Sequence, residues 1–370
     1  MPDTSVSYKC PNCGAPLSFL PGHDHVTCEY CSTELAVETV ESLFEREQEK
    51  ARLAAEARDS RWNTEGAGSE WDEQEAGAMR LQTCSSCGAE LVSDGNTMAT
   101  ECAYCGSPNM MPQQFHGMLK PDYVIPFKKT KEEAIAALKK FYEKRYLLPD
   151  AFKSNNRIKE IQAMYVPFWL FDSAVTASAS FRAENDRVYE TADEVITETS
   201  VYSCERSGSM KFERIPVDGS ERMDDTYMES IEPFDYGDLV PFSAAYFTGF
   251  LADKYDVDAE ASAPRADKRV TESALGVLES TVEGYTRRTL EGEPCIIKED
   301  GTVSYAMVPV WILTTKYENK PYTFMMNGQT GKVVGSLPID KRKAMLYPLV
   351  ASLVSVPILY FIAKFVLGSI

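Results

Sequence analysis

Histidine is scarce in this sequence, and its absence from most of the chain limits the chemistry available. The 370 residues include three histidines, His23, His25 and His116, all in the first third of the chain. The long region after residue 120 therefore cannot supply the histidine of a Ser-His-Asp triad. The Gly-x-x-x-x-Gly-Lys-Ser/Thr phosphate loop of ATPases and helicases is absent as well. We expect a protein that is not an enzyme.

Basic residues are also few. The chain has 38 lysines and arginines against 56 acidic residues, a formal net charge of -18, so it should be repelled by phosphate backbones. Residues 1–10 contain neither an apolar core nor a cleavage-site pattern, and we expect no secretion signal there. In the reducing cytosol that this implies, paired cysteines favour metal binding over disulfides.

Eight of the ten cysteines form a duplicated pattern. Each copy has two Cys-x-x-Cys pairs separated by fourteen residues, and Tyr30 in the first copy matches Tyr104 in the second. The cysteines are Cys10, Cys13, Cys28 and Cys31, then Cys84, Cys87, Cys102 and Cys105. Two tight turns that each present two thiolates complete a tetrahedron around one ion, which is the zinc-ribbon signature. The pattern predicts two structural zinc ions, each with a closed coordination shell.

Other ligand and disulfide arrangements remain open at this stage. The spacing could arise by chance or mark disulfides, and His23 and His25, inside the first ribbon, could compete with the cysteines as ligands. We favour the four-cysteine sets because each is complete without histidine. Cys204 and Cys295 stand alone and are interpreted as semi-buried small residues.

The charge of the ribbons themselves favours protein over nucleic acid as a partner. Residues 81–109 contain no lysine or arginine, and the first ribbon offers Lys9 against Asp24, Glu29 and Glu34. A phosphate-binding ribbon needs cations on its surface. We therefore expect the ribbons to dock protein partners.

The segment between the ribbons is charged and polar. Residues 40–59 are rich in Glu, Ala and Arg and predict a mostly solvated helix, whereas residues 63–77 hold glycines among Ser and Glu and predict a flexible linker. The two ribbons should then move independently. Trp62 and Trp71 could anchor a partner, although partly exposed aromatic residues are common and this simpler interpretation is favoured.

The region from 121 to 338 contains a fainter duplication. Val-Ile-Pro-Phe at 124–127 and Tyr-Val-Pro-Phe-Trp-Leu at 165–170 are matched by Leu-Val-Pro-Phe at 239–242 and Met-Val-Pro-Val-Trp-Ile at 307–312. This predicts an α+β body of two units, each with a helix followed by an antiparallel sheet. The Pro-aromatic phrases could line a binding groove, but a role in the core is favoured.

The expected helices of the body have local signals. Thr130 and Glu133 form a capping box for a helix that ends before Pro149, and Ser243 should begin a helix through 255. A third helix should span 269–290 with Leu275, Leu278 and Val282 on its buried face.

Strands are expected at 295–298, 303–317, 322–326 and 332–337, with turns at Asp300-Gly301 and Asn327-Gly328, and between 158 and 215 with interruptions at 184–186 and 207–209.

The C-terminal part of the chain is a candidate membrane span. Residues 344–363 carry no charge and would extend about 30 Å as a helix, the thickness of the hydrocarbon layer. Lys341, Arg342 and Lys343 precede this stretch and Lys364 follows it, so the positive-inside rule leaves the rest of the chain in the cytoplasm. We expect a tail-anchored, single-pass protein of the cell membrane, although a buried core helix is the alternative.

The predicted order is zinc ribbon 1 at 1–37, a charged helix and linker at 38–79, zinc ribbon 2 at 80–112, α+β units at 120–236 and 237–340, and a transmembrane helix at 344–366. This order resembles bacterial membrane proteins of the YdjG type, often labelled TFIIB-type zinc-ribbon proteins. The resemblance rests on the paired ribbons, the phrase at 165–171, the stretch at 322–335 with Asn-Gly-Gln-Thr-Gly-Lys, and the terminal span.

Members of that family are encoded near phage-shock-type membrane-remodelling proteins and flotillin-like scaffold proteins. The resemblance therefore implies a membrane-tethered zinc-ribbon adaptor for such partners, acting in a membrane-stress or membrane-remodelling assembly. A membrane-bound regulator that uses its ribbons on nucleic acid is the alternative.

Overall fold

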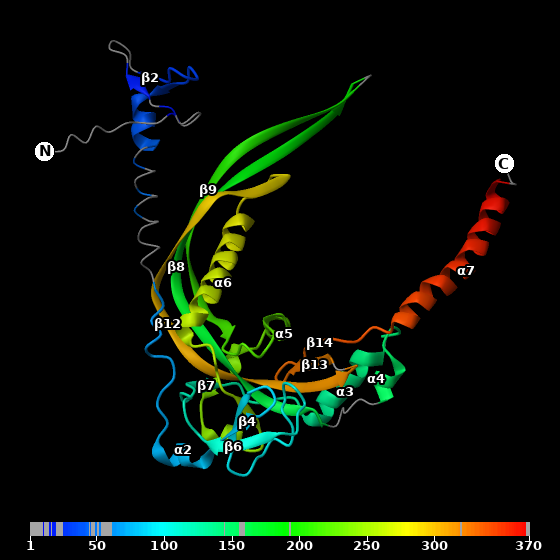
Figure 1. Ribbon diagram of the computed structural model, residues 1–370. Helices are drawn as coiled ribbons and strands as arrows, with labels where there is room; N and C mark the ends of the chain where they lie inside the picture. Colours follow the sequence, from blue (N-terminus) through cyan, green and yellow to red (C-terminus); the bar gives the residue numbers. More distant parts are fainter. Residues whose placement is uncertain are drawn as a thin grey trace. The chain divides into compact units, whose positions relative to one another are not determined.

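The computed structural model divides the chain into two compact units, shown as a ribbon in Figure 1. It describes residues 10, 15, 17–19, 25–43, 45, 49, 52, 61–143, 145–154, 160–191, 194–318 and 320–367. Unit 1 comprises Met1–Arg61, Ser173–Phe212 and Lys268–Gly301, and unit 2 comprises Trp62–Asp172, Glu213–Asp267 and Thr302–Ile370. Because the segments interleave, the predicted arrangement of two successive helix-then-sheet units is not confirmed.

One large sheet contains most of the strands. Its order is β10-β7-β12-β8-β11-β5-β4-β6, with β9 added to β8 and with β13 and β14 following β12. The strands are β4 Met79–Cys84, β5 Glu90–Asp94, β6 Met110–Gln114, β7 Tyr123–Val124, β8 Gln162–Glu190, β9 Val195–Asp218, β10 Val240–Pro241, β11 Leu251–Asp253, β12 Arg287–Tyr317, β13 Lys320–Asn327 and β14 Val333–Gly335. The sheet is mixed rather than purely antiparallel, because β7 pairs in parallel with β12 and β11 in parallel with β8.

The duplicated Pro-aromatic phrases occupy matching environments in unit 2. Val124 of the first short phrase pairs directly with Val240 of the second. In the two longer phrases, the carbonyl of Pro167 accepts from the N–H of Gly219 at 2.9 Å, and the carbonyl of Pro309 accepts from the N–H of Gly328 at 2.8 Å. The repeated sequence therefore repeats a backbone hydrogen-bond pattern.

The core of unit 2 is built from these same phrases. Phe168 and Trp169 of β8 and Val308 and Val310 of β12 are all at most 1% exposed. The prediction that the Pro-aromatic phrases form core rather than a groove is confirmed for these two longer phrases, whereas Val240 and Pro241 of the second short phrase are half-buried and exposed. A second apolar cluster gathers under α3 Lys131–Glu143 and α4 Asp150–Ser154.

The helix α3 begins where the capping box predicts. The N–H of Thr130 donates to the Glu133 carboxylate at 2.8 Å, and the N–H of Glu133 donates to the Thr130 hydroxyl at 3.3 Å. These reciprocal bonds satisfy two backbone donors that the first turn leaves unpaired. Buried Leu138 and Tyr142 give the helix its inner face.

Two other helix predictions are wrong in extent. Ser243 caps only a 3-10 turn, η3 Ala244–Phe247, because Gly249 takes a φ of 81° and the chain then joins the sheet as β11. The helix expected at 269–290 is α6 Ala259–Ser280, which starts earlier because Asp258 accepts from the N–H of Ala261 at 2.7 Å. Of the three residues predicted on the buried face, Leu278 and Val282 are buried and Leu275 is half-buried.

The C-terminal meander of β12, β13 and β14 is antiparallel as predicted. Several predicted interruptions are wrong, however. Asp300-Gly301 lies within the continuous strand β12, residues 184–186 lie within β8, and residues 207–209 lie within β9. Polar residues mark a turn only where the backbone leaves its hydrogen-bonded neighbour strand. Here the strands β8, β9 and β12 continue through the polar residues.

The segment 63–77 differs from the predicted flexible linker because it is held in unit 2. The indole N–H of Trp62 donates to Asp267 at 2.7 Å, and its ring meets Phe171 edge-on at 5.0 Å. The N–H of Gly68 donates to Asp122 at 2.8 Å. The short helix α2 Glu73–Ala78 lies at the end of this segment. Unit 2 also contains the helix α5 Asp225–Ile231 and the 3-10 turn η2 Tyr236–Asp238.

Unit 1 contains a small three-stranded antiparallel sheet, β1 Ser18–Phe19, β2 His25–Thr27 and β3 Glu34–Ala36. Residues 37–43 continue from β3 as a helix. Of the helix predicted at 40–59, the described residues 40–43, 45, 49 and 52 are helical, and the others lie outside the described residues.

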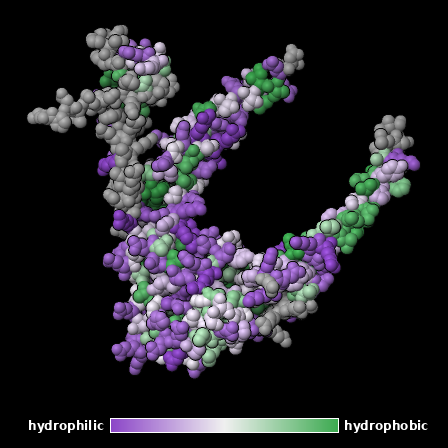
Figure 2. All heavy atoms as spheres, viewed as in Figure 1, coloured by the Kyte–Doolittle hydropathy of each residue, from purple (hydrophilic) through white to green (hydrophobic). Residues whose placement is uncertain are grey.

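The C-terminal helix α7 Lys341–Leu367 has the length and composition of a membrane span. Its segment Lys341–Lys364 is 24 residues long, and the most apolar 18-residue stretch of that segment has a mean hydropathy of 2.0 and is not buried against the protein at all. Figure 2 shows apolar residues along this helix. The alternative of a buried core helix is therefore wrong.

Candidate metal centre

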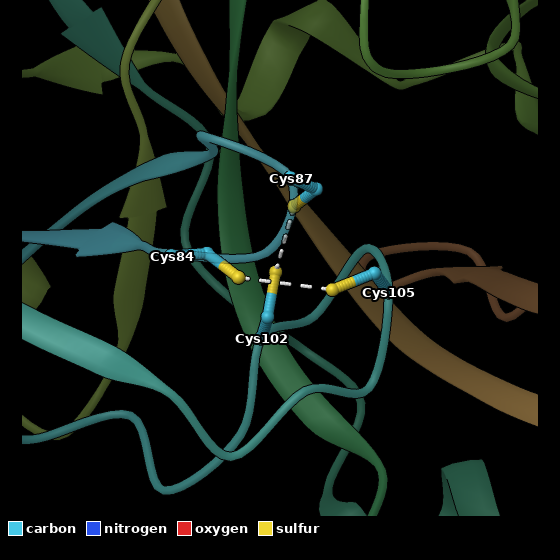
Figure 3. A group of neighbouring side chains, drawn as sticks. All are labelled: Cys84, Cys87, Cys102 and Cys105. Carbon is cyan, nitrogen blue, oxygen red and sulfur yellow. Dashed lines mark hydrogen bonds between the residues drawn. The ribbon is translucent and has the colours of Figure 1, made fainter.

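Four cysteines of unit 2 converge on one point, shown in Figure 3. Cys84 ends β4, Cys87 lies in the turn before β5, and Cys102 and Cys105 lie in the loop between β5 and β6. The Sγ atoms of Cys84 and Cys105 are 3.7 Å apart, and those of Cys87 and Cys102 are 3.6 Å apart. Metal–sulfur bonds of about 2.3 Å in a tetrahedron separate the sulfurs by about 3.8 Å, so the group fits a tetrahedral ion.

Matching backbone turns aim these sulfurs. The N–H of Gly88 donates to the Cys84 carbonyl at 2.8 Å, and the N–H of Gly106 donates to the Cys102 carbonyl at 2.9 Å. Both glycines adopt the left-handed conformation, with φ of 74° and 65°, which costs glycine little. The Cys-x-x-Cys-Gly sequence therefore specifies the turn as well as the ligands.

The protein's own electrostatics act unequally on the thiols. Burial opposes ionisation of Cys84, but the backbone N–H groups of Cys87 and Ser86 outweigh it and lower the pKa of this thiol to about 7. Burial raises the pKa of Cys102 and of Cys105. A bound cation favours the thiolate form of each, because metal ligation releases the thiol proton.

Three cysteines of unit 1 form a similar group. The Sγ atoms of Cys10, Cys28 and Cys31 lie within 4.8 Å of one another, and those of Cys10 and Cys31 are 3.6 Å apart. The fourth predicted ligand, Cys13, lies outside the described residues.

The first site uses the same backbone turns as the second. The N–H of Cys10 donates to Ala15 at 2.7 Å, as the N–H of Cys84 donates to Ala89 at 2.8 Å. Ser32 stands where the second ribbon has Gly106, and it still adopts a φ of 57°.

The competing histidine ligands find no support in unit 1. The Nε2 atom of His25 lies 3.9 Å from a carboxylate oxygen of Glu34, and the cysteine group does not include it. His23 lies outside the described residues.

The second ribbon is built into unit 2, contrary to the prediction of an independent module. Its strand β5 pairs with β11, with Val92 opposite Ala252. The hydroxyl of Thr314 donates to the Ala103 carbonyl at 2.8 Å, inside the loop that carries Cys102 and Cys105. The four-cysteine group therefore belongs to the same sheet as the body.

A buried polar cluster beside this ribbon was not predicted. Tyr104, between two ligands, packs on the core of unit 2, and Asp253 of β11 is 0% exposed. The hydroxyls of Tyr104 and Ser220 lie beside the Asp253 carboxyl, but among the described residues no hydrogen bond of ordinary length and angle reaches either oxygen of that carboxyl or the Tyr104 hydroxyl. Burial raises the pKa of Asp253 to about 7, although the hydroxyls of Tyr104 and Ser220 partly offset it. The sequence offers one clue, the tyrosine that repeats at positions 30 and 104, but only the structure shows that Tyr104 is half-buried while Tyr30 is 79% exposed.

The Asn-Gly-Gln-Thr-Gly-Lys loop after β13 is a structural element. Buried Asn327 donates to the Ile231 carbonyl at 3.0 Å and accepts from the N–H groups of Gln329 and Thr330, both at 2.9 Å. Gln329 in turn exchanges hydrogen bonds with the backbone of Asp235 at 2.7 and 2.9 Å. Both side chains are thus occupied in holding the segment after α5.

Comparison with known proteins gives one relative of nearly full length. No protein-family model and no solved structure matches the chain. The chain is 35% identical over 340 residues to a protein of Bacillus subtilis (strain 168) described as uncharacterized protein YdjG, and the match covers 91% of this chain and 92% of YdjG. Identity at that level over that length establishes common descent, and the chain belongs to the YdjG family.

Proposed function

We propose that this protein is a non-enzymatic, membrane-tethered zinc-ribbon adaptor that docks protein partners at the cytoplasmic face of the cell membrane. The observation that carries the proposal is that the apolar stretch of α7 contributes no buried surface to the fold while being long and apolar enough to span a bilayer. A helix that leaves such a surface in water needs an apolar environment of another kind. Lys341, Arg342 and Lys343 before the span favour a cytoplasmic body.

Zinc is the proposed ion because the donors are soft thiolates at tetrahedral separations. Four protein sulfurs leave no position for water or substrate, which favours a structural role over catalysis. In each ribbon the ion would fix the loops rather than take part in a reaction.

We propose that the two ribbons have different roles, the second in the fold of unit 2 and the first in partner docking. The second is fixed in unit 2 through β5 and Tyr104, whereas the first presents Tyr30 to solvent with 79% of its surface exposed. Exposed aromatic residues are frequent anchors at protein interfaces. We therefore assign partner docking to the first ribbon. The resemblance to YdjG-type proteins suggests flotillin-like and phage-shock-type proteins as the partners to test.

Recruitment in cells tests the adaptor. A fluorescent candidate partner, first identified by purification of the full chain from detergent-solubilised membranes, should be membrane-bound with the full chain and dispersed when the chain ends at Leu337. Replacing α7 by an unrelated membrane span should restore recruitment, and Tyr30→Ala should weaken it. A partner that stays at the membrane without this protein would refute the proposal. Tight, salt-sensitive binding of nucleic acid would support the regulator hypothesis instead.

A further inference from the structure

The start of α7 is fastened to the connection between α3 and α4. The N–H of Asp340 donates to the Leu147 carbonyl at 2.8 Å. The ammonium of Lys343 donates to the Leu148 carbonyl at 3.0 Å and to the Asp150 carboxylate at 2.8 Å. Figure 1 shows α3 and α4 at the base of α7. If α7 enters a bilayer, residues 146–148 are therefore held at the level of the lipid headgroups.

The side chains exposed at this point suit that level. Tyr146 is 72% exposed, Leu147 is 38% exposed and Ile339 is 65% exposed. Leu148, which follows Leu147 in the chain, is 1% exposed and anchors the connection between α3 and α4 in the core. Tyrosine is enriched where a membrane meets water, because its ring is apolar and its hydroxyl is polar. A cluster of three such residues in water is otherwise unfavourable.

The charge around them is the reverse of the charge of the whole chain. Exposed Lys140 and Arg145 lie at the end of α3 and just beyond it, and exposed Arg342 lies in the first turn of α7. Of the nearby acids, Asp340 caps α7 by accepting from the N–H of Arg342 at 2.9 Å, and Asp150 is paired with Lys343. Glu143, the last residue of α3, is exposed as well, so the three cations outnumber it. Cations within about 10 Å of an anionic leaflet are attracted to it.

We propose that Tyr146, Leu147, Ile339, Lys140, Arg145 and Arg342 form a membrane-facing patch that rests on the anionic bilayer surface. The inference depends on the proposed tether, since α7 brings the patch to the lipid. The three apolar side chains enter the interface and the three cations meet lipid phosphates. Unit 2 is thereby held against the membrane through a second contact besides α7.

The test uses the full chain with Tyr146→Trp, reconstituted in vesicles of phosphatidylglycerol and phosphatidylcholine. The four native tryptophans are subtracted by measuring the unsubstituted chain in parallel. The added tryptophan should emit at shorter wavelength than in water and lose most of its intensity when lipids brominated near the headgroup are included. Tyr30→Trp, at a similarly exposed position, is the control and should not be quenched. Equal quenching at both positions, or none at 146, would overturn the proposal.

The charge component has its own variant. Lys140→Glu with Arg145→Glu, placed in the Tyr146→Trp chain, should reduce quenching in anionic vesicles, and added salt should do the same to the parent. Quenching unchanged by either, or equal in pure phosphatidylcholine, would overturn the role of anionic lipid. Carbonate extraction of the same vesicles distinguishes the proposed tether from the proposed patch. If carbonate releases the chain from the vesicles, the tether is refuted. If the chain stays in the vesicles but the tryptophan at 146 is not quenched, only the patch is refuted.

Discussion

At the scale of single residues, a few positions carry constraints that their neighbours do not. Gly328 lies against the Phe127 ring, so that a Cβ there would come within 2.6 Å of Phe127 and 2.9 Å of Pro309. Phe127 cannot move aside, because it stacks on Phe250 at 4.7 Å and meets Trp311 edge-on at 5.4 Å. Such a site tolerates hydrogen alone.

Gly328→Ala should therefore destabilise unit 2 by about 1–3 kcal/mol, the usual cost of overpacking a core. The measurement is the urea midpoint of the full chain in detergent, followed by tryptophan fluorescence. Gly66→Ala, where a Cβ meets nothing within 4 Å, is the matched control and should leave the midpoint nearly unchanged. Equal midpoints for the two variants would show that Phe127 yields.

Asp253 should make stability depend on pH. Its pKa is raised by burial from 3.8 to about 7, so the folded state favours the neutral carboxyl and the unfolded state the charged one. The stability that this gives is present below pH 3.8 and is lost as the pH rises through about 7, at up to about 1.4 kcal/mol per pH unit. Asp253→Asn removes this loss.

The difference in unfolding free energy between Asp253→Asn and the parent isolates this effect from the titration of the metal ligands, which both chains share. It should grow in favour of the variant between pH 5 and 7 and level off above, as measured by urea unfolding. A difference that does not change with pH would mean that Asp253 is hydrated or paired in solution.

At the scale of elements, local signals predicted what local chemistry determines. The capping box of Thr130 and Glu133 predicted the start of α3, and the Cys-x-x-Cys spacing brought Cys84, Cys87, Cys102 and Cys105 together. Residues 249–255 were predicted as helix, but Leu251–Asp253 instead gains pairing on both edges, from β5 and β8. Such pairing joins residues far apart in sequence, and no periodicity within the segment reveals it.

The two ribbons should differ when their metal is lost. Cys84→Ser with Cys87→Ser should remove one zinc ion per chain and lower the unfolding midpoint of unit 2, because β4 and β5 belong to its sheet. Cys28→Ser with Cys31→Ser should also remove one ion but leave that midpoint in place. All four tryptophans, Trp62, Trp71, Trp169 and Trp311, lie in unit 2, so their fluorescence reports it selectively. Elemental analysis gives the metal count, and equal midpoints for the two pairs would contradict the integration of the second ribbon.

At the scale of the whole molecule, the order of two cysteine groups, a body with a large sheet and a long apolar C-terminal helix was predictable, whereas the grouping into units was not. The linker prediction failed because Trp62 and Gly68 find partners near residues 267 and 122, far along the chain. Polar composition indicates that a segment can be solvated, but a few specific contacts decide whether it is. The long apolar C-terminal helix was predictable because an uncharged run of that length is a property of the sequence alone.

Folding and location should therefore separate when the chain ends at Leu337. The helix buries none of its apolar stretch, and its removal deletes the Asp340–Leu147 hydrogen bond and the Lys343–Asp150 ion pair. Because water screens an ion pair this exposed, the thermal midpoint of unit 2 should fall by about 4 °C at most. The shortened chain should be soluble without detergent and keep the metal content of the parent. Lys343→Ala in the full chain is the control for the ion pair and should show part of the same decrease while the protein stays in the membrane fraction. A shortened chain that still sediments with membranes, or whose tryptophan transition disappears, would mean that α7 serves the fold rather than the tether.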